Sequence, residues 1–333
     1  MAIMTGAESA SAEASAGSAL REVLPRRYAQ DFAAPSVCLP FLKVPDIVHM
    51  GLNKLAPQSW ITPCSQLPHY LNNKTAAYQR LGEKVYAQLP ESLPAQRELV
   101  ELLHRHLLQD HSGYVRTAAG TLRWRGASGD LHWPGVESVL RSASPLRDAG
   151  RWIADDVCLL LPGDTGYQLV AAYLAAPSYW RLEEKIGRPL NQIHAPVPGF
   201  QNKLAGQMAR FFDHLKPEYP VWRSNWSVVD SPALLQRGEM ASGLDEGAES
   251  GKSLYLRIER QSLRRLPNTG AVVFTIRVMI NPLEDLLPIE GGLSALAAAV
   301  AQMSPEEGRY KSLAPLLPSL QQFFSRHLED PSA

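Results

Sequence analysis

Cysteine is scarce in this chain of 333 residues, which contains only Cys38, Cys64 and Cys158, none of them in a C-x-x-C pair. Such an odd, sparse set argues against a disulfide framework and against a four-cysteine iron–sulfur cluster or zinc site. Sparse, odd-numbered cysteines are typical of a reducing compartment, so we expect a cytoplasmic location.

Two further absences limit where the chain acts. Lys plus Arg and Asp plus Glu both number 33, so the net charge is zero and no strong field attracts the chain to nucleic acid or to an anionic membrane. No apolar run approaches the roughly 20 residues of a membrane span. The start, 1–20, is rich in Ala, Ser and Gly and lacks the basic and apolar parts of a secretory signal, so we expect a disordered tail there.

Short catalytic and nucleotide-binding motifs are missing as well. The sequence contains no Walker motif, no G-x-S-x-G, no H-E-x-x-H and no G-x-G-x-x-G. These absences remove the functions that such motifs indicate, including dinucleotide binding through a Rossmann turn. The function must therefore be inferred from longer segments.

Proline spacing and periodicity divide the rest of the chain into three parts. The first, 21–150, combines a Pro-rich arm with two amphipathic helices, and the first of these helices is predicted over 72–89. Phe32, Phe41 and Trp60 are the apolar anchors that we expect to hold the arm on a core.

The second part, 151–290, shows the period of strands. Two apolar runs, 156–162 and 167–174, flank a Gly-containing turn and predict a β-hairpin. Ser178 is a candidate cap for a helix that ends at Gly187. Another helix is predicted over 206–215, and three more strands over 221–229, 253–260 and 271–280.

This order of elements predicts an α+β fold with a five-stranded antiparallel sheet and helices on one face. It is the element order of a PAS domain, a scaffold that binds haem and flavin, although many α+β domains share it. The third part, 291–333, returns to helices and contains a capping box from Ser304 to Glu307. We expect these helices to pack on the same core, so that helical extensions flank the sheet at both ends of the chain.

His194 is the first residue with a chemical interpretation. It follows a helix break and lies among Ile193, Pro196 and Val197. A neutral imidazole in an apolar wall is suited to binding a haem iron. A histidine that only bonds the backbone of a loop fits the same pattern, so both interpretations stay open from these residues alone.

The segment 257–277 carries five arginines among strand-forming residues. Residues two apart in a strand share a face, so Arg257 and Glu259 point the same way. The carboxylate could bind a cationic amine or pass protons to bound oxygen, and the arginines, Arg264 among them, could hold haem propionates. A structural ion pair is the alternative.

Two tryptophans, Trp222 and Trp226, alternate with Arg223 and Asn225 in the strand predicted over 221–229. The tryptophans and the polar residues therefore face opposite sides of a sheet. Both tryptophans are plausible core residues, which leaves the polar pair for the other face.

Together these segments resemble a family once described only as a domain of unknown function, whose characterised members are haem-dependent oxidative N-demethylases with a haem-binding, PAS-type α subunit. The matching stretches are Pro-Ser-x-Trp with Glu-Lys-x-Gly-x-Pro-Leu-x-x-Ile-His-x-Pro-Val-Pro, then Arg-x-Asn-Trp, then Arg-x-Glu-x-Gln-x-Leu-x-x-Leu-Pro. Val48–Leu52, Trp60 and Arg309–Lys311 fit as well, and the resemblance covers about 41–313.

The resemblance implies haem b in a PAS pocket with a histidine axial ligand, and His194 stands at the matching position. It implies oxidation of a small secondary amine, dimethylamine in the known case, with O2 and release of formaldehyde. Glu259 is expected to bind the amine and transfer protons, and Lys185 to polarise oxygen or hold a propionate. The other expected pocket residues are Arg223, Asn225, Arg257 and Arg264.

The chain departs from the family in its electron supply. The family enzyme draws electrons from NADPH through a flavin and a 2Fe–2S centre, for which this chain has neither the cysteines nor a dinucleotide motif. We therefore expect a partner reductase subunit and a homo- or hetero-oligomer. Cys158 is an alternative thiolate ligand of the haem, although a cysteine in an apolar strand is usually core. A haem PAS gas sensor and a non-catalytic haem-binding protein are the alternative functions.

Overall fold

The computed structural model describes residues 39–42, 50–62, 64–127, 129–200, 204–237 and 253–328. The expected tail 1–20, the anchor Phe32, Cys38 and part of Val48–Leu52 lie outside the described residues. No helix within the described ranges has the length and the apolar character needed to cross a bilayer.

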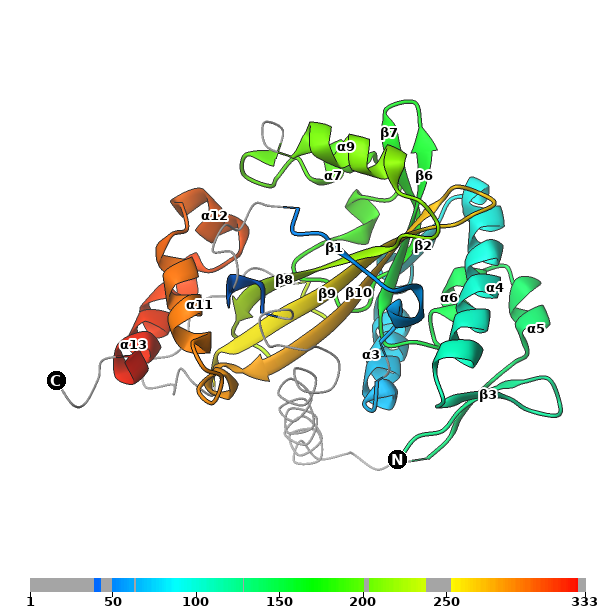
Figure 1. Cartoon of the computed structure of the whole chain (residues 1–333), viewed down its shortest axis with the longest axis horizontal. Helices are drawn as coiled ribbons and strands as arrows, with labels where there is room; N and C mark the ends of the chain where they lie inside the picture. The colour runs from blue at the N-terminus through cyan, green and yellow to red at the C-terminus, as the bar shows by residue number, and fades with distance from the viewer. Residues whose placement is uncertain are drawn as a thin grey trace.

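Within these ranges, one antiparallel sheet of seven strands forms the core (Figure 1). Its strands are β1 (Asn53–Lys54), β2 (Tyr86–Gln88), β6 (Asp156–Gly163), β7 (Gly166–Tyr173), β8 (Val221–Val229), β9 (Tyr255–Arg265) and β10 (Val272–Pro282). They are ordered β1-β8-β9-β10-β6-β7-β2. The five predicted strands occupy consecutive places, and two short strands from the N-terminal part extend the edges. The sheet is therefore larger than predicted.

A second, three-stranded sheet and the helices complete the fold. The small sheet consists of β3 (Tyr114–Arg116), β4 (Leu122–Trp124) and β5 (Leu131–Trp133). The α-helices are α3 (Leu67–Leu81), α4 (Leu93–Asp110), α5 (Val136–Leu140), α6 (Pro145–Ala149), α7 (Leu190–Ile193), α9 (Ala205–His214), α11 (Gly292–Ala301), α12 (Pro305–Tyr310) and α13 (Leu317–Leu328). Short 3-10 helices are η1 (Pro40–Leu42), η2 (Pro57–Ser59), η3 (Gly82–Lys84), η4 (Pro90–Ser92), η5 (Leu182–Glu184), η6 (Leu283–Leu286) and η7 (Ala314–Leu316).

Helices cover both faces of the large sheet, not one face as predicted. In β6, Val157 and Leu159 belong to an apolar cluster with α3 and α4, whereas Cys158 and Leu160 belong to a cluster with η5, α7 and α9. Successive strand residues point to opposite faces, so the two clusters lie on opposite sides. We name these sides the α4 face and the α9 face.

Two C-terminal helices, α11 and α13, pack on the α4 face as well. They lie at the other end of the strands from α4 (Figure 1). Ile258 in β9 and Met279 in β10 lie opposite each other and share one apolar cluster with Leu296 of α11 and Phe323 of α13. The α4 face is thus covered twice, by α3 and α4 at one end and by α11 and α13 at the other.

The N-terminal arm is tied to the α4 face by arginines of β9. Trp60 is completely buried, as its assignment as an anchor predicts. Arg260 donates hydrogen bonds to the carbonyl oxygens of Trp60 at 3.1 Å and Ser59 at 2.8 Å. The guanidinium of Arg264 lies 4.8 Å from the centre of a Trp60 ring, in cation–π contact.

Two predicted helices are shorter in the structure. The helix predicted over 72–89 ends at Leu81, because Gly82 takes a φ of 52°, and the residues that follow form η3 and the edge strand β2. The helix expected after Ser178 is reduced to η5. Tyr179 has a φ of 53°, a left-handed conformation that interrupts a right-handed helix.

The start of α12 provides a test of local stability. Ser304 Oγ accepts the N–H of Glu307 at 3.2 Å, and the Glu307 carboxylate accepts the N–H of Ser304 at 2.9 Å, which completes the predicted capping box. Ser304→Ala should lower the free energy of unfolding by about 1 kcal/mol in urea denaturation. Ser294→Ala removes an exposed hydroxyl that only donates to a carbonyl, and should change it by less than about 0.5 kcal/mol. Equal losses of unfolding free energy in both variants would contradict the capping role of Ser304.

Candidate active site

Four of the expected site residues meet where β8 and β9 lie side by side. Their antiparallel register sets Asn225 opposite Glu259 and Arg223 opposite Gln261. Arg257 lies two residues before Glu259 in the same strand and therefore shares its face. Because directly opposite residues also share a face, all five side chains project from the α9 face.

Glu259 is at the centre of this group, and its side chain is only 15% exposed. Its Oε1 accepts the Nε–H of Arg257 at 3.3 Å. Its Oε2 accepts the Nδ2–H of Asn225 at 3.3 Å and the Nε2–H of Gln261 at 3.0 Å. A carboxylate has about four acceptor positions, so these three donors fix its orientation and leave capacity for a bound ligand.

Arg257 supports Glu259 from inside the protein. Its side chain is fully buried. One Nη donates to the carbonyl oxygen of Ala176 at 2.5 Å and the other to that of Leu234 at 3.3 Å. The guanidinium is therefore held by backbone groups on one side and by the Glu259 carboxylate on the other.

Lys311 is a site residue to which the sequence gives no role, although Arg309–Lys311 is part of the family pattern. It follows α12, and its Nζ donates to Asn225 Oδ1 at 3.2 Å and to the carbonyl oxygen of Trp226 at 2.5 Å. An ammonium group can only donate, so it requires the amide oxygen of Asn225 to face it. The amide nitrogen of Asn225 is thereby directed at Glu259.

Burial lowers the pKa of Lys311 to about 8, against the opposing effect of the Glu259 carboxylate. The preceding residue, Tyr310, is about half exposed. Partial burial and the charge of Glu259 raise the pKa of the Tyr310 hydroxyl, whereas Arg223 lowers it. These couplings and the contact of Lys311 with Asn225 place the end of α12 beside Arg223, Asn225, Arg257, Glu259 and Gln261, which we call the Glu259 group.

His194 is the residue that follows α7, and the charge of Arg223 in β8 acts on its ring. Its Nδ1 lies 2.9 Å from the carbonyl oxygen of Leu190, and its ring stacks on Phe200 with centroids 5.2 Å apart. A carbonyl only accepts, so Nδ1 carries the proton and Nε2 of the neutral ring holds a lone pair. Burial lowers the pKa of His194, and the positive charges of Arg223 and Lys185 lower it further, which favours the neutral ring.

A family model described as haem-dependent oxidative N-demethylase, alpha subunit-like, matches residues 51–320. The chain belongs to this family. The matched range contains all the residues of the Glu259 group, as well as Lys311 and His194. The family name states haem dependence and an oxidative N-demethylase activity, and the words alpha subunit imply an enzyme with other subunits.

The residues of this N-demethylase-like chain fit a haem group. A metal-binding histidine normally donates its other N–H to a carbonyl or carboxylate, and His194 does so through Nδ1. The positive charges of Arg223 and Lys185 act on the His194 ring, and Lys311 is coupled to Arg223 and to Glu259. Haem brings two propionates, and cationic side chains of this kind are their usual partners.

Arg264 does not lie with the other expected site residues, which corrects the expectation that it shares a pocket with them. It is five residues from Glu259 in β9, and an odd spacing directs a strand residue to the opposite face. Its guanidinium lies on Trp60 on the α4 face instead. Trp222 and Trp226 are 7% and 5% exposed and are core residues, as their alternation with the polar pair predicts.

Cys158, the alternative haem ligand, lies in the apolar cluster of the α9 face with Leu182 and Phe212. Burial raises the pKa of its thiol far above the usual range, and Asp156 raises it further. A thiol in this environment stays protonated and is a poor metal ligand. The structure therefore favours His194 over Cys158.

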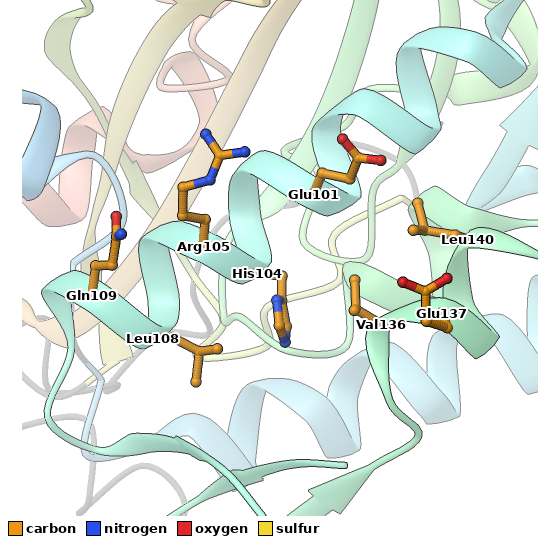
Figure 2. Close-up of a pocket in the computed structure, with 8 residues that line it drawn as sticks. All are labelled: Glu101, His104, Arg105, Leu108, Gln109, Val136, Glu137 and Leu140. Atoms are coloured by element: carbon orange, nitrogen blue, oxygen red, sulfur yellow. The ribbon is translucent and has the colours of Figure 1, made fainter. Parts of the chain in front are cut away.

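A surface pocket of about 400 Å³ lies elsewhere, between α4 and α5 (Figure 2). It is lined by Glu101, His104, Arg105, Leu108, Gln109, Val136, Glu137 and Leu140. None of these is an expected site residue, and those on α4 are not among the residues that this helix buries.

The environment of Lys311 predicts a pH dependence of stability. Its pKa of about 8 in the folded state is below the 10.5 of an ordinary lysine, so between these values the unfolded chain binds more protons and stability rises with pH. From pH 8 to 10, wild type should gain stability relative to Lys311→Met by up to about 1.4 kcal/mol per pH unit. Urea unfolding at several pH values measures this difference.

Lys216→Met is the matched control, because Lys216 is exposed. Its stability difference from wild type should stay constant over the same pH range. A constant difference for Lys311→Met as well would show that Lys311 is not held in a desolvated environment.

Proposed function

We propose that this chain is the haem-binding subunit of an oxidative N-demethylase that acts on a small secondary amine such as dimethylamine. The observation that supports it is that Arg223 is coupled both to His194, whose Nε2 holds a lone pair, and to Glu259, whose carboxylate has spare acceptor capacity. In the overall reaction, dimethylamine, O2, two electrons and two protons give methylamine, formaldehyde and water.

In this proposal His194 binds the iron of haem b through Nε2. Haem bound there supplies the centre at which O2 is activated. Arg223 and Lys185 hold the haem propionates or polarise bound oxygen. Both side chains carry the positive charge that either role requires. The five consecutive strands with η5, α7 and α9 form the PAS-like unit at 151–290, and the helices of 291–333 pack on the same core.

Glu259 binds the substrate as an ammonium ion and accepts or returns its proton. A secondary ammonium group has two N–H donors, and the fixed carboxylate offers them an acceptor at a defined place. Asn225, Gln261 and Arg257 keep that carboxylate in position. The site can thus select a small cation by charge and hold its methyl groups in one orientation.

Electrons come from NADPH through a flavin and a 2Fe–2S centre on a partner reductase subunit. The alpha-subunit description of the family supports a multi-subunit enzyme. The three cysteines of this chain are too few for such a cluster, which supports its location on another chain.

The haem assignment predicts a spectrum. Protein produced with a haem precursor should show a Soret band, and His194→Ala should lose or shift it. The matched control is His214→Ala. His214 also directs Nδ1 at the carbonyl oxygen four residues earlier, but it is exposed. A colourless wild type after haem reconstitution would refute the proposal. A Soret band unchanged in His194→Ala would refute the assignment of His194 as the iron ligand.

The amine assignment predicts a second spectroscopic effect. Titration of the haem-loaded protein with dimethylamine should shift the Soret band, and Glu259→Gln should raise the apparent Kd about ten- to a hundred-fold. This range follows from the roughly 1.5–3 kcal/mol of a charged hydrogen bond. Glu306→Gln, which changes an exposed glutamate on α12, should leave the Kd unchanged. A haem protein that no small secondary amine perturbs would be a sensor or a non-catalytic haem-binding protein instead.

A further inference from the structure

A second buried polar group lies on the α4 face, on the other side of the sheet from the proposed haem site. Its centre is the ion pair between Arg277 of β10 and Asp155, both almost completely buried. Arg277 directs Nε and Nη2 at the same oxygen, Oδ2, with Nε at 3.0 Å. Nη2 also donates to the carbonyl oxygen of Thr62 at 3.0 Å.

Four side-chain atoms around this pair are buried and have no hydrogen-bond partner among the described residues. They are Asp155 Oδ1, Arg277 Nη1, Thr62 Oγ1 and His111 Nδ1. The residues that carry them are each 9% exposed or less. Arg277 binds the carbonyl oxygen of Thr62. The preceding residue, Ile61, binds His106, which His111 contacts at 3.1 Å, so the four residues are neighbours. Buried polar atoms without partners are costly, and native proteins rarely leave several together.

The tautomers of two histidines define what His111 offers. The N–H of Ile61 donates to His106 Nε2 at 3.2 Å, so this nitrogen is a lone-pair acceptor and His106 donates through Nδ1 to Asp110 at 2.7 Å. His111 Nε2, 3.1 Å from His106 Nε2, must then carry a proton. Burial lowers the pKa of His111 to about 4, so the ring is neutral near pH 7 and its Nδ1 is a bare acceptor.

We infer that this group is a binding site for an internal water molecule held by Asp155, Arg277, His111 and Thr62. Asp155 Oδ1 and His111 Nδ1 each need a donor, and a water molecule has two. Arg277 Nη1 and the Thr62 hydroxyl can donate, and a water oxygen accepts two hydrogen bonds. All four partners are thereby satisfied, which is within the two to four contacts of buried waters in proteins.

Water fits this site better than an ion. The charges of Arg277 and Asp155 already cancel, so an added anion or cation would be buried without compensation. The bound water extends an ordered chain of hydrogen bonds that runs from the site through His111 and His106 to Asp110, whose side chain is 28% exposed. This series of hydrogen bonds links α4, the arm around Thr62 and the strand β10.

A crystal structure of the full chain at a resolution that orders internal waters tests this inference. Density for a water should lie within roughly 2.6–3.2 Å of both Asp155 Oδ1 and His111 Nδ1. Direct pairing of these atoms with other protein groups, or a different molecule in contact with them, would overturn the inference. The proposed haem site is on the other face, so this result does not depend on haem binding.

Nitrogen NMR of the histidines gives an independent test in solution. His111 should be the neutral form with its proton on Nε2, and its Nδ1 resonance should show an accepted hydrogen bond. Thr62→Val removes one partner of the water with little change in volume, and should shift the Nδ1 resonance of His111. Thr165→Val, in the exposed hairpin turn, should not shift it. A proton on Nδ1 of His111, or no response to Thr62→Val, would contradict the water site.

Discussion

The register between β8 and β9 is the constraint on which the candidate site depends. It sets Asn225 directly across from Glu259, so that the amide reaches the carboxylate and Gln261 reaches it from the same face. A slip of one residue would send one strand's side chains to the opposite face. Trp226 of β8 and Ile258 of β9, packed in the core of the other face, resist that slip because it would move one of them to the polar side.

The alternation of side chains along β9 also places its arginines on opposite faces of the sheet, where they have different partners. Arg257 occupies the α9 face, where it supports Glu259, whereas Arg260 and Arg264 occupy the α4 face and hold the N-terminal arm through Trp60. Arg277 on the same face pairs with Asp155. Each buried guanidinium thus meets a carboxylate, a carbonyl or a ring, which is the condition for keeping such a charge inside a protein. The strand β9 thereby contributes both to the candidate site and to the attachment of the N-terminal arm.

The site is built by elements that are far apart in the sequence. Lys311 reaches Asn225 across 86 positions, and it fixes which end of that amide faces Glu259. His194 comes from the segment after α7 and is coupled to Arg223 of β8 through their charges. The cationic side chains of Arg223 and Lys185 suit a cofactor with two propionates, and the spare acceptor position on Glu259 suits a small ammonium ion. These features connect the fold to the proposed reaction.

Local patterns in the sequence were sufficient for the hairpin of β6 and β7, the strand β8, the capping box at Ser304 and the shared face of Arg257 and Glu259, because each depends on neighbours within a few residues. The family motifs singled out His194 and Glu259 as candidates. Only the tertiary structure decided the edge strands β1 and β2, the helices on both faces, the exclusion of Arg264 and the role of Lys311. Strand pairing and the burial of an ammonium group depend on contacts between distant segments, which periodicity does not record.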